Sequence, residues 1–188
     1  MSLIEAERII ANNGDWSDGK FTGEGEIKYE NGESYSGDIY DSYRDGYGVY
    51  KFNNGDYYEG SWTKGHRANS GKMYYENGDC YEGQWNQSLR HGNGRITFAD
   101  GTLFEGQFVE DTILGEGKLE LIDGREYDGT FQKNECTGSG KVTFTNGEAY
   151  QGDVISGAPF GNGIYTFFNN EKYIGEWKNG IQEGKGEY

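Results

Sequence analysis

The sequence predicts an all-β protein built from successive antiparallel β-hairpins. Three features carry this prediction: a 23-residue internal period, aromatic and glycine residues spaced two apart, and Asn-Gly or Asp-Gly pairs at fixed places in each copy. Three consecutive copies show the period as Tyr58, Gly60 and Trp62, then Tyr81, Gly83 and Trp85, then Phe104, Gly106 and Phe108. A single hairpin cannot bury its own apolar face, so neighbouring copies must stabilise one another.

The first eleven residues predict a short N-terminal capping helix, residues 1–11. Ser2 and Glu5 have the spacing of a capping box, in which each side chain satisfies a free backbone amide at a helix start. Leu3, Ala6 and Ile10 then fall at helical spacing. A helix this short is marginal alone, so we expect it to pack on the first repeat as a cap.

The repeat array is expected over residues 12–188, as eight 23-residue copies of which the first is degenerate and the last truncated. Asn12, Gly14 and Trp16 lie on the register of the later anchors. In each regular copy, the leading aromatic residue, the glycine and the next apolar residue lie on one strand face, because their spacing is two. A polar loop, a Gly-x-Gly pair and a second alternating segment follow, so each copy predicts two antiparallel strands.

The intervening positions predict a polar opposite face. One copy places Glu82, Gln84, Arg95 and Thr97 there. Such a face is typical of a sheet side exposed to water, with opposite charges available for cross-strand pairing. Sixteen strands form a large open sheet, and sheets of that size usually curl, which lets the aromatic face become buried.

Composition and charge limit the partners. The 188 residues include 33 glycines and one proline, with 17 Lys and Arg against 32 Asp and Glu, for a net charge of −15. This charge repels nucleic acid and anionic lipid, so we expect no nucleic acid partner and do not favour a membrane, whereas a basic or apolar protein segment fits. No apolar run reaches membrane-spanning length, Met1 to Gly14 does not resemble a signal peptide, and only Cys80 and Cys136 are present. We therefore expect a cytoplasmic protein.

Residues with catalytic or ligand-binding potential give no coherent site. Gly138 to Lys141 superficially resembles a phosphate-binding loop, but Glu135 stands where its upstream glycine belongs. His66 and His91 lie in different loops without metal-ligand spacing. We therefore predict no catalytic residues, no metal and no cofactor, and we expect the protein not to be an enzyme.

The segments Tyr173 to Gly186 and Tyr81 to Gly94 resemble the MORN (membrane occupation and recognition nexus) repeat, with its Tyr-x-Gly-x-Trp pattern, polar loop and Gly-x-Gly pair. The resemblance extends from Asn12 to Tyr188, as in MORN-only proteins. It implies an elongated, twisted array of hairpins that forms a single curved sheet with a groove. Departures from the pattern are local: Asn69 and Asn170 replace glycines, Ile39 and Val154 replace the tryptophan, and Ala158 with Pro159 alters one loop.

The resemblance also implies a function. MORN-only proteins of this size are similar to scaffolds or adaptors of cytoskeletal assemblies, in cilia and flagella, including the axoneme and its radial spoke heads, or in cortical structures. This implies cytoskeletal association in the cytoplasm or cilium. The alternative is a membrane-associated adaptor that contacts phosphoinositides, against which the net charge argues.

The aromatic row supplies the candidate binding residues. We predict that a partner segment binds in the groove over the central rings Tyr58, Trp62, Tyr81, Trp85, Phe104 and Phe108. The alternative is that these rings fill the groove as core. The last strand, which ends at Tyr188, is expected to present an open edge through which copies self-associate or the chain docks in a larger assembly.

Overall fold

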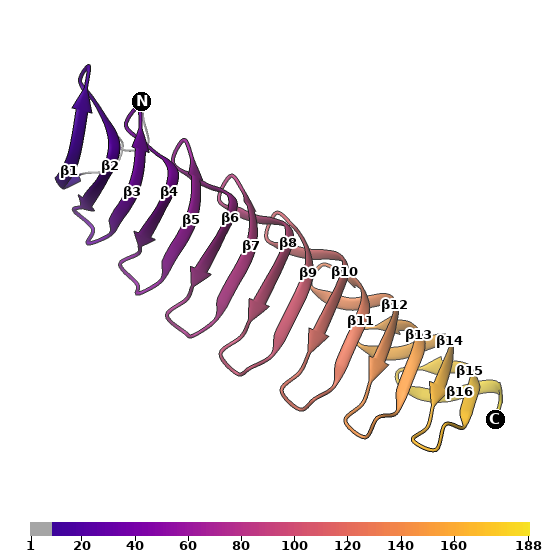
Figure 1. The fold of residues 1–188 in the computed structure, drawn as a ribbon. Coiled ribbons are helices and arrows are strands. Elements are labelled where there is room, and N and C mark those ends of the chain that lie inside the picture. The colour runs from indigo at the N-terminus through magenta and orange to yellow at the C-terminus, as the bar shows by residue number, and fades with distance from the viewer. Residues whose placement is uncertain (1–8) are drawn as a thin grey trace. The chain divides into compact units, whose positions relative to one another are not determined.

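The structure, a computed structural model, describes residues 9–188 and is all-β over them (Figure 1). Sixteen strands follow one another in the antiparallel sheet in the order of the chain, and the sheet is not closed. Their bounds are β1 Ile9–Ser17, β2 Lys20–Tyr29, β3 Ser34–Tyr40, β4 Tyr43–Lys51, β5 Tyr57–Thr63, β6 His66–Tyr74, β7 Cys80–Asn86, β8 Leu89–Thr97, β9 Leu103–Val109, β10 Thr112–Glu120, β11 Glu126–Gln132, β12 Glu135–Thr143, β13 Ala149–Ile155, β14 Ala158–Thr166, β15 Lys172–Lys178 and β16 Ile181–Glu187. The prediction of two strands per copy is confirmed.

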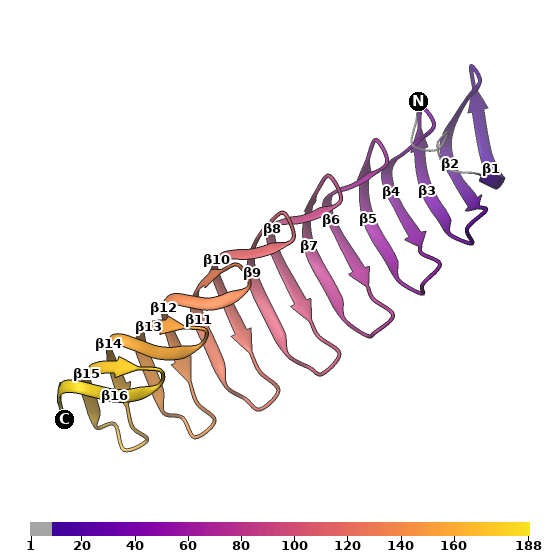
Figure 2. The same cartoon turned by 180° about the vertical axis from the view of Figure 1, so that it is seen from behind.

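The chain divides into two compact units, with the boundary between Gly94 and Arg95 inside β8. Unit 1 holds β1 to β7 and most of β8. Unit 2 holds the end of β8 and β9 to β16. Within each unit, successive hairpins of the same design lie side by side, as both views show (Figure 2).

The predicted N-terminal helix is not seen in the described part of the chain. Residues 1–8 lie outside the described residues, and β1 already begins at Ile9. Ile9 pairs with Tyr29 and Ala11 with Lys28, so the prediction of helix is wrong for residues 9–11. The physical reason is that a short helix is marginal alone, whereas these residues gain backbone pairing with the end of β2.

A β-bulge in each regular hairpin explains the Tyr-x-Gly pattern. In β5 and β6, Gly60 pairs with Gly71, and the register then shifts before Trp62 pairs with Arg67. The Tyr58 hydroxyl donates a hydrogen bond to the carbonyl of Ser61, which faces the extra residues of β6, at 3.0 Å. A Cβ on Gly60 would lie 2.6 Å from the Tyr58 hydroxyl oxygen. Glycine is therefore required where the ring crosses the backbone.

Aromatic rings pack edge to face along one side of each unit, which we call the ring face. In unit 1, Tyr58 lies between Trp62 and Trp85, with ring centroids 5.2 and 5.3 Å away and interplanar angles of 90° and 84°. In unit 2, Phe104 packs likewise against Phe108 and Phe131, at 5.5 and 4.9 Å. Edge-to-face pairs stabilise by about 0.5–1.5 kcal/mol beyond the area that they bury. The core of this single-layer sheet is this row of rings.

Hairpin tips attach each copy to the one before it. The second turn residue donates its backbone N–H to a carbonyl 21 residues earlier, as in Ser42 to Phe21, Gly65 to Arg44, Ser88 to Arg67, Asn134 to Ile113, Gly157 to Cys136 and Gly180 to Pro159. Ser42, Ser88 and Asn134 occupy positive φ angles of 63°, 68° and 70°, which favour glycine. Each accepts a second hydrogen bond on its side chain from the backbone N–H of the same earlier residue. This second bond offsets part of the backbone strain.

The Asn-Gly pairs form the predicted turns. Asn77 accepts a hydrogen bond on its side-chain oxygen from the Asp79 backbone N–H at 3.0 Å, and Gly78 has a φ of 94°. Asn170, where the other copies have this glycine, also has a positive φ, of 66°. Asparagine tolerates this conformation better than other residues with a side chain, so the substitution leaves the turn intact.

Candidate functional site

The six ring residues predicted to bind a partner are all buried. Their exposed fractions range from 0% for Tyr58 and Tyr81 to 5% for Trp62 and Trp85, with 1% for Phe104 and Phe108. The structure brings the first four together in unit 1 through edge-to-face contacts, and Phe104 contacts Phe108 in unit 2. The rings serve as packing of the sheet, and their contact with a partner stays a prediction.

Three arginines at one repeat position lie over this ring row in unit 1. The Arg44 guanidinium carbon lies 4.8 Å from the Tyr50 ring centroid, that of Arg67 lies 4.3 Å from Trp85, and that of Arg90 lies 5.6 Å from Tyr81. Arg44 and Arg67 also donate to the carbonyls of Gly65 and Ser88 in the following hairpin tip. These guanidinium groups therefore join successive copies and cover the rings.

The opposite side of the sheet, the polar face, carries an aromatic cluster that sequence reasoning missed. Tyr57 and Tyr74 stack with ring centroids 4.3 Å apart and an interplanar angle of 15°. Tyr47 lies two strands from Tyr74 and is 55% exposed, while Tyr57 is 37% exposed. The period contains a usable signal: the later copies have Ser70, Asn93, Glu116, Ser139 and Asn162 at the position of Tyr47, and Thr97, Glu120, Thr143 and Thr166 at that of Tyr74. Tyrosine at positions that are polar in the later copies is therefore the sequence signal for this cluster.

Beside these tyrosines lies a shallow depression of about 500 Å³, which we call the tyrosine depression. Its lining includes the side chains of Tyr47, Glu59, Lys72, Tyr74 and Glu82, together with three glycines. The Tyr47 hydroxyl donates to Glu59 Oε1 at 2.9 Å, which raises the pKa of Tyr47. Lys72 Nζ lies 2.9 Å from Glu82 Oε2, and this hydrogen bond raises the pKa of Lys72.

The corresponding place in unit 2 has different chemistry. There a depression of about 1020 Å³ is lined by Ile164 and Ile174, which pair across β14 and β15. These residues stand at the repeat positions of Lys72 and Glu82. The two units therefore offer an apolar pair and an ion pair at equivalent sites.

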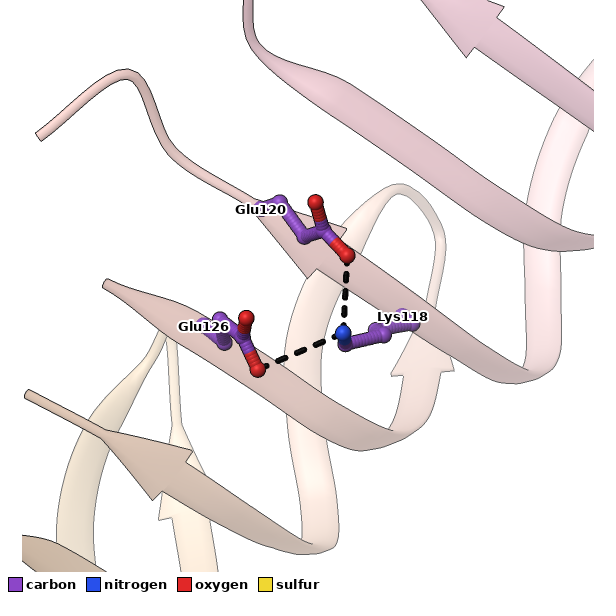
Figure 3. Close-up of polar contacts among 3 residues, drawn as sticks. All are labelled: Lys118, Glu120 and Glu126. Atoms are coloured by element: carbon purple, nitrogen blue, oxygen red, sulfur yellow. Dashed lines mark hydrogen bonds and ion pairs between the residues drawn. The ribbon is translucent and has the colours of Figure 1, made fainter. Parts of the chain in front are cut away.

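Elsewhere the polar face of unit 2 pairs its own charges, as predicted. Lys118 Nζ lies 2.7 Å from Glu120 Oε1 and 3.3 Å from Glu126 Oε2 (Figure 3). Hydrogen bonds to both carboxylates raise the pKa of Lys118. Exposed pairs of this kind contribute little to stability. Lys118 balances one of the two carboxylates, so the cluster keeps a net charge of −1.

The described residues, 9–188, hold no group of three potential metal ligands. The Gly138 to Lys141 segment lies within β12, where Gly140 pairs with Gly129 and Gly152, so it is not a phosphate loop. Burial raises the pKa of the Cys136 thiol to about 11, which keeps it protonated at neutral pH. The same residues include no helix that is long and apolar enough to cross a membrane.

Hairpins of one design, hydrogen-bonded in chain order, define an open repeat sheet. The chain belongs to the MORN repeat family, whose model matches residues 13–34, 35–57, 58–80, 81–103, 104–124, 127–149, 150–172 and 173–188. These matches span nearly the whole chain, as in a MORN-only protein. No curated protein sequence matches it.

Solved structures that are similar to this chain include TCP domains. The chain is similar to the TCP domain of SAS-4 (dCPAP) of Drosophila melanogaster, in complex with a proline-rich motif of Ana2 (dSTIL), with a TM-score of 0.54, 15% identity, and coverage of 93% of this chain and 92% of that one. The TCP10 domain of Danio rerio CPAP, in complex with a peptide of STIL, matches with a TM-score of 0.34, 16% identity, and coverage of 88% and 84%. At 15% identity, the likeness to the SAS-4 domain concerns the fold alone.

Proposed function

We propose that this protein is a non-catalytic scaffold that binds an extended segment of a partner protein on its repeat sheet. The observation that carries the proposal is the tyrosine depression, where the half-exposed ring of Tyr47 and the ring of Tyr74 stand among polar side chains of unit 1. Exposed aromatic residues around a depression are typical of protein-binding sites, because rings offer large contact area at low cost in side-chain entropy.

The chemistry of the depression supports a proline-rich segment as partner. Such segments adopt the extended polyproline II conformation and dock on aromatic surfaces, where proline rings pack between aromatic side chains. The TCP domain of similar fold was solved with a proline-rich motif. On this proposal the six buried rings act indirectly, by holding the backbone that carries the depression.

The wider role that we propose is that of an adaptor in a cytoskeletal assembly, ciliary or cortical. This proposal rests on family resemblance. It locates the protein in the cytoplasm with the cytoskeleton, and isolation of the native protein with its bound partners tests it.

Peptide binding tests the molecular proposal directly. We expect short, fluorescently labelled proline-rich peptides to bind the full chain, and Tyr74→Ala to weaken that binding by about tenfold, because half of the stacked pair is lost. Tyr40→Ala is the matched control, since Tyr40 is 69% exposed and lies outside the depression. Equal binding by both variants, or binding to phosphoinositide vesicles without any to peptides, would contradict the proposal.

A further inference from the structure

We infer that the tyrosine depression selects partner segments that carry an arginine side chain, which it holds between the ring of Tyr47 or Tyr74 and the carboxylate of Glu59. The inference rests on the proposed function and adds to it the chemistry of the partner.

The charges of the depression favour a cation. Its charged side chains are two glutamates and one lysine, and Lys72 already pairs with Glu82 at 2.9 Å. Glu59 accepts the Tyr47 hydroxyl on Oε1 and forms no ion pair with any residue between 9 and 188. A carboxylate has about four acceptor positions on its two oxygens, so Glu59 keeps capacity for a guanidinium. The net charge of −15 would also attract a basic segment.

The rings favour arginine over lysine. A planar guanidinium stacks on an aromatic face while its N–H groups reach a carboxylate, and a lysine ammonium does so less well. Unit 1 already uses this contact on its ring face, where Arg67 lies 4.3 Å from the centroid of Trp85. On the polar face, Tyr47 and Tyr74 offer ring surface beside Glu59, and Tyr47 is more than half exposed.

Unit 2 lacks this combination at the corresponding site. Ile164 and Ile174 replace the ion pair, and the lining includes neither a tyrosine nor a glutamate at the position of Glu59, where Gln151 stands. The selectivity for arginine is therefore assigned to unit 1.

Two peptides and two variants test the inference. The probes are a proline-rich peptide with one central arginine and the same peptide with glutamine at that place. Glu59→Gln keeps the size of the side chain and its capacity to accept from Tyr47, so it removes the charge without disturbing the sheet. Glu105→Gln is the matched control, because Glu105 occupies the same repeat position, is exposed, and does not line the depression.

We expect the wild-type chain to bind the arginine peptide about tenfold more tightly than the glutamine peptide, a preference that Glu59→Gln abolishes and Glu105→Gln retains. Added salt should weaken binding of the arginine peptide to the wild-type chain, and it should affect binding to the Glu59→Gln variant less. Equal binding of both peptides, or an unchanged preference in Glu59→Gln, overturns the inference while the proposed function stands. If the wild-type chain binds neither peptide, the proposed function itself is contradicted.

Discussion

Arg67 and Ser88, 21 residues apart, are joined by three hydrogen bonds. The Ser88 backbone N–H donates to the Arg67 carbonyl at 2.9 Å, the Arg67 backbone N–H donates to Ser88 Oγ at 3.1 Å, and Arg67 Nη2 donates to the Ser88 carbonyl at 2.8 Å. This attachment joins one hairpin tip to the strand of the preceding copy. It gives the repeat array backbone contacts beyond those of the strand ladder.

Ser88→Ala should destabilise unit 1 by about 1–2 kcal/mol. The variant keeps a positive φ of 68° at a residue with a Cβ but loses the acceptor for the Arg67 N–H. Ser88→Gly is the control: relief of strain offsets the lost bond, so its stability should stay close to that of the wild type. Urea unfolding followed by circular dichroism measures both, and equal destabilisation by alanine and glycine would contradict the explanation.

Phe104→Tyr should stabilise unit 2 by about 1 kcal/mol. Leading tyrosines in the other copies donate to the carbonyl three residues later, as Tyr81 does to Gln84 at 2.8 Å, whereas Phe104 has no hydroxyl. Tyr81→Phe is the reciprocal change and should destabilise by a similar amount. Denaturant midpoints of the two variants should move in opposite directions, and a shift in the same direction would show that the hydroxyl does not act through this bond.

Trp85→Ala should cost about 3–5 kcal/mol of stability, because the ring is 5% exposed and contacts both Tyr58 and Tyr81. Trp16→Ala, at a ring that is 59% exposed, is the control and should have a much smaller effect. Thermal unfolding by circular dichroism compares them. A folded Trp85→Ala variant that loses only partner binding would instead favour the sequence-based prediction that this ring contacts a ligand.

The protein should lose stability in alkaline solution. Burial raises the pKa of Tyr127 and of Tyr165 to about 12, from an ordinary value of 10.0, and at Tyr165 the hydrogen bond to Glu148 contributes as well. The unfolded chain releases these protons first, so the stabilisation is complete below pH 10 and falls as the pH rises from 10 to 12. Circular dichroism and tyrosinate absorbance, recorded together, check this. Ionisation of all tyrosines near pH 10 without unfolding would contradict it.

Much of the fold could be predicted because the period repeats every local signal. The turn at Asn77 and Gly78, and the alternation of Tyr58, Gly60 and Trp62, each specify a hairpin locally. The helix at the N-terminus could not be judged in this way, because Ile9 to Ala11 gain their strand pairing from β2, a contact that helical spacing does not reveal. Only the structure explains why asparagine fits at position 69, where φ is 54°. In the next copy the equivalent residue is Gly92, and a Cβ there would collide with the side chain of Gln84. In the copy of Asn69, the shorter Ser61 replaces Gln84 and leaves room for a side chain.

The sequence by itself determined the repeat, the strand pairs, the turns and the separation of a ring face from a polar face, because these depend on residues within one copy. Only the tertiary structure decided which aromatic rings are accessible to a partner. Tyr58 and Trp85 cover one another across neighbouring copies and are buried, whereas Tyr47 and Tyr74 lie on the opposite face beside Glu59. Exposure depends on what the adjacent strands place beside a ring, and that is a property of packing between copies.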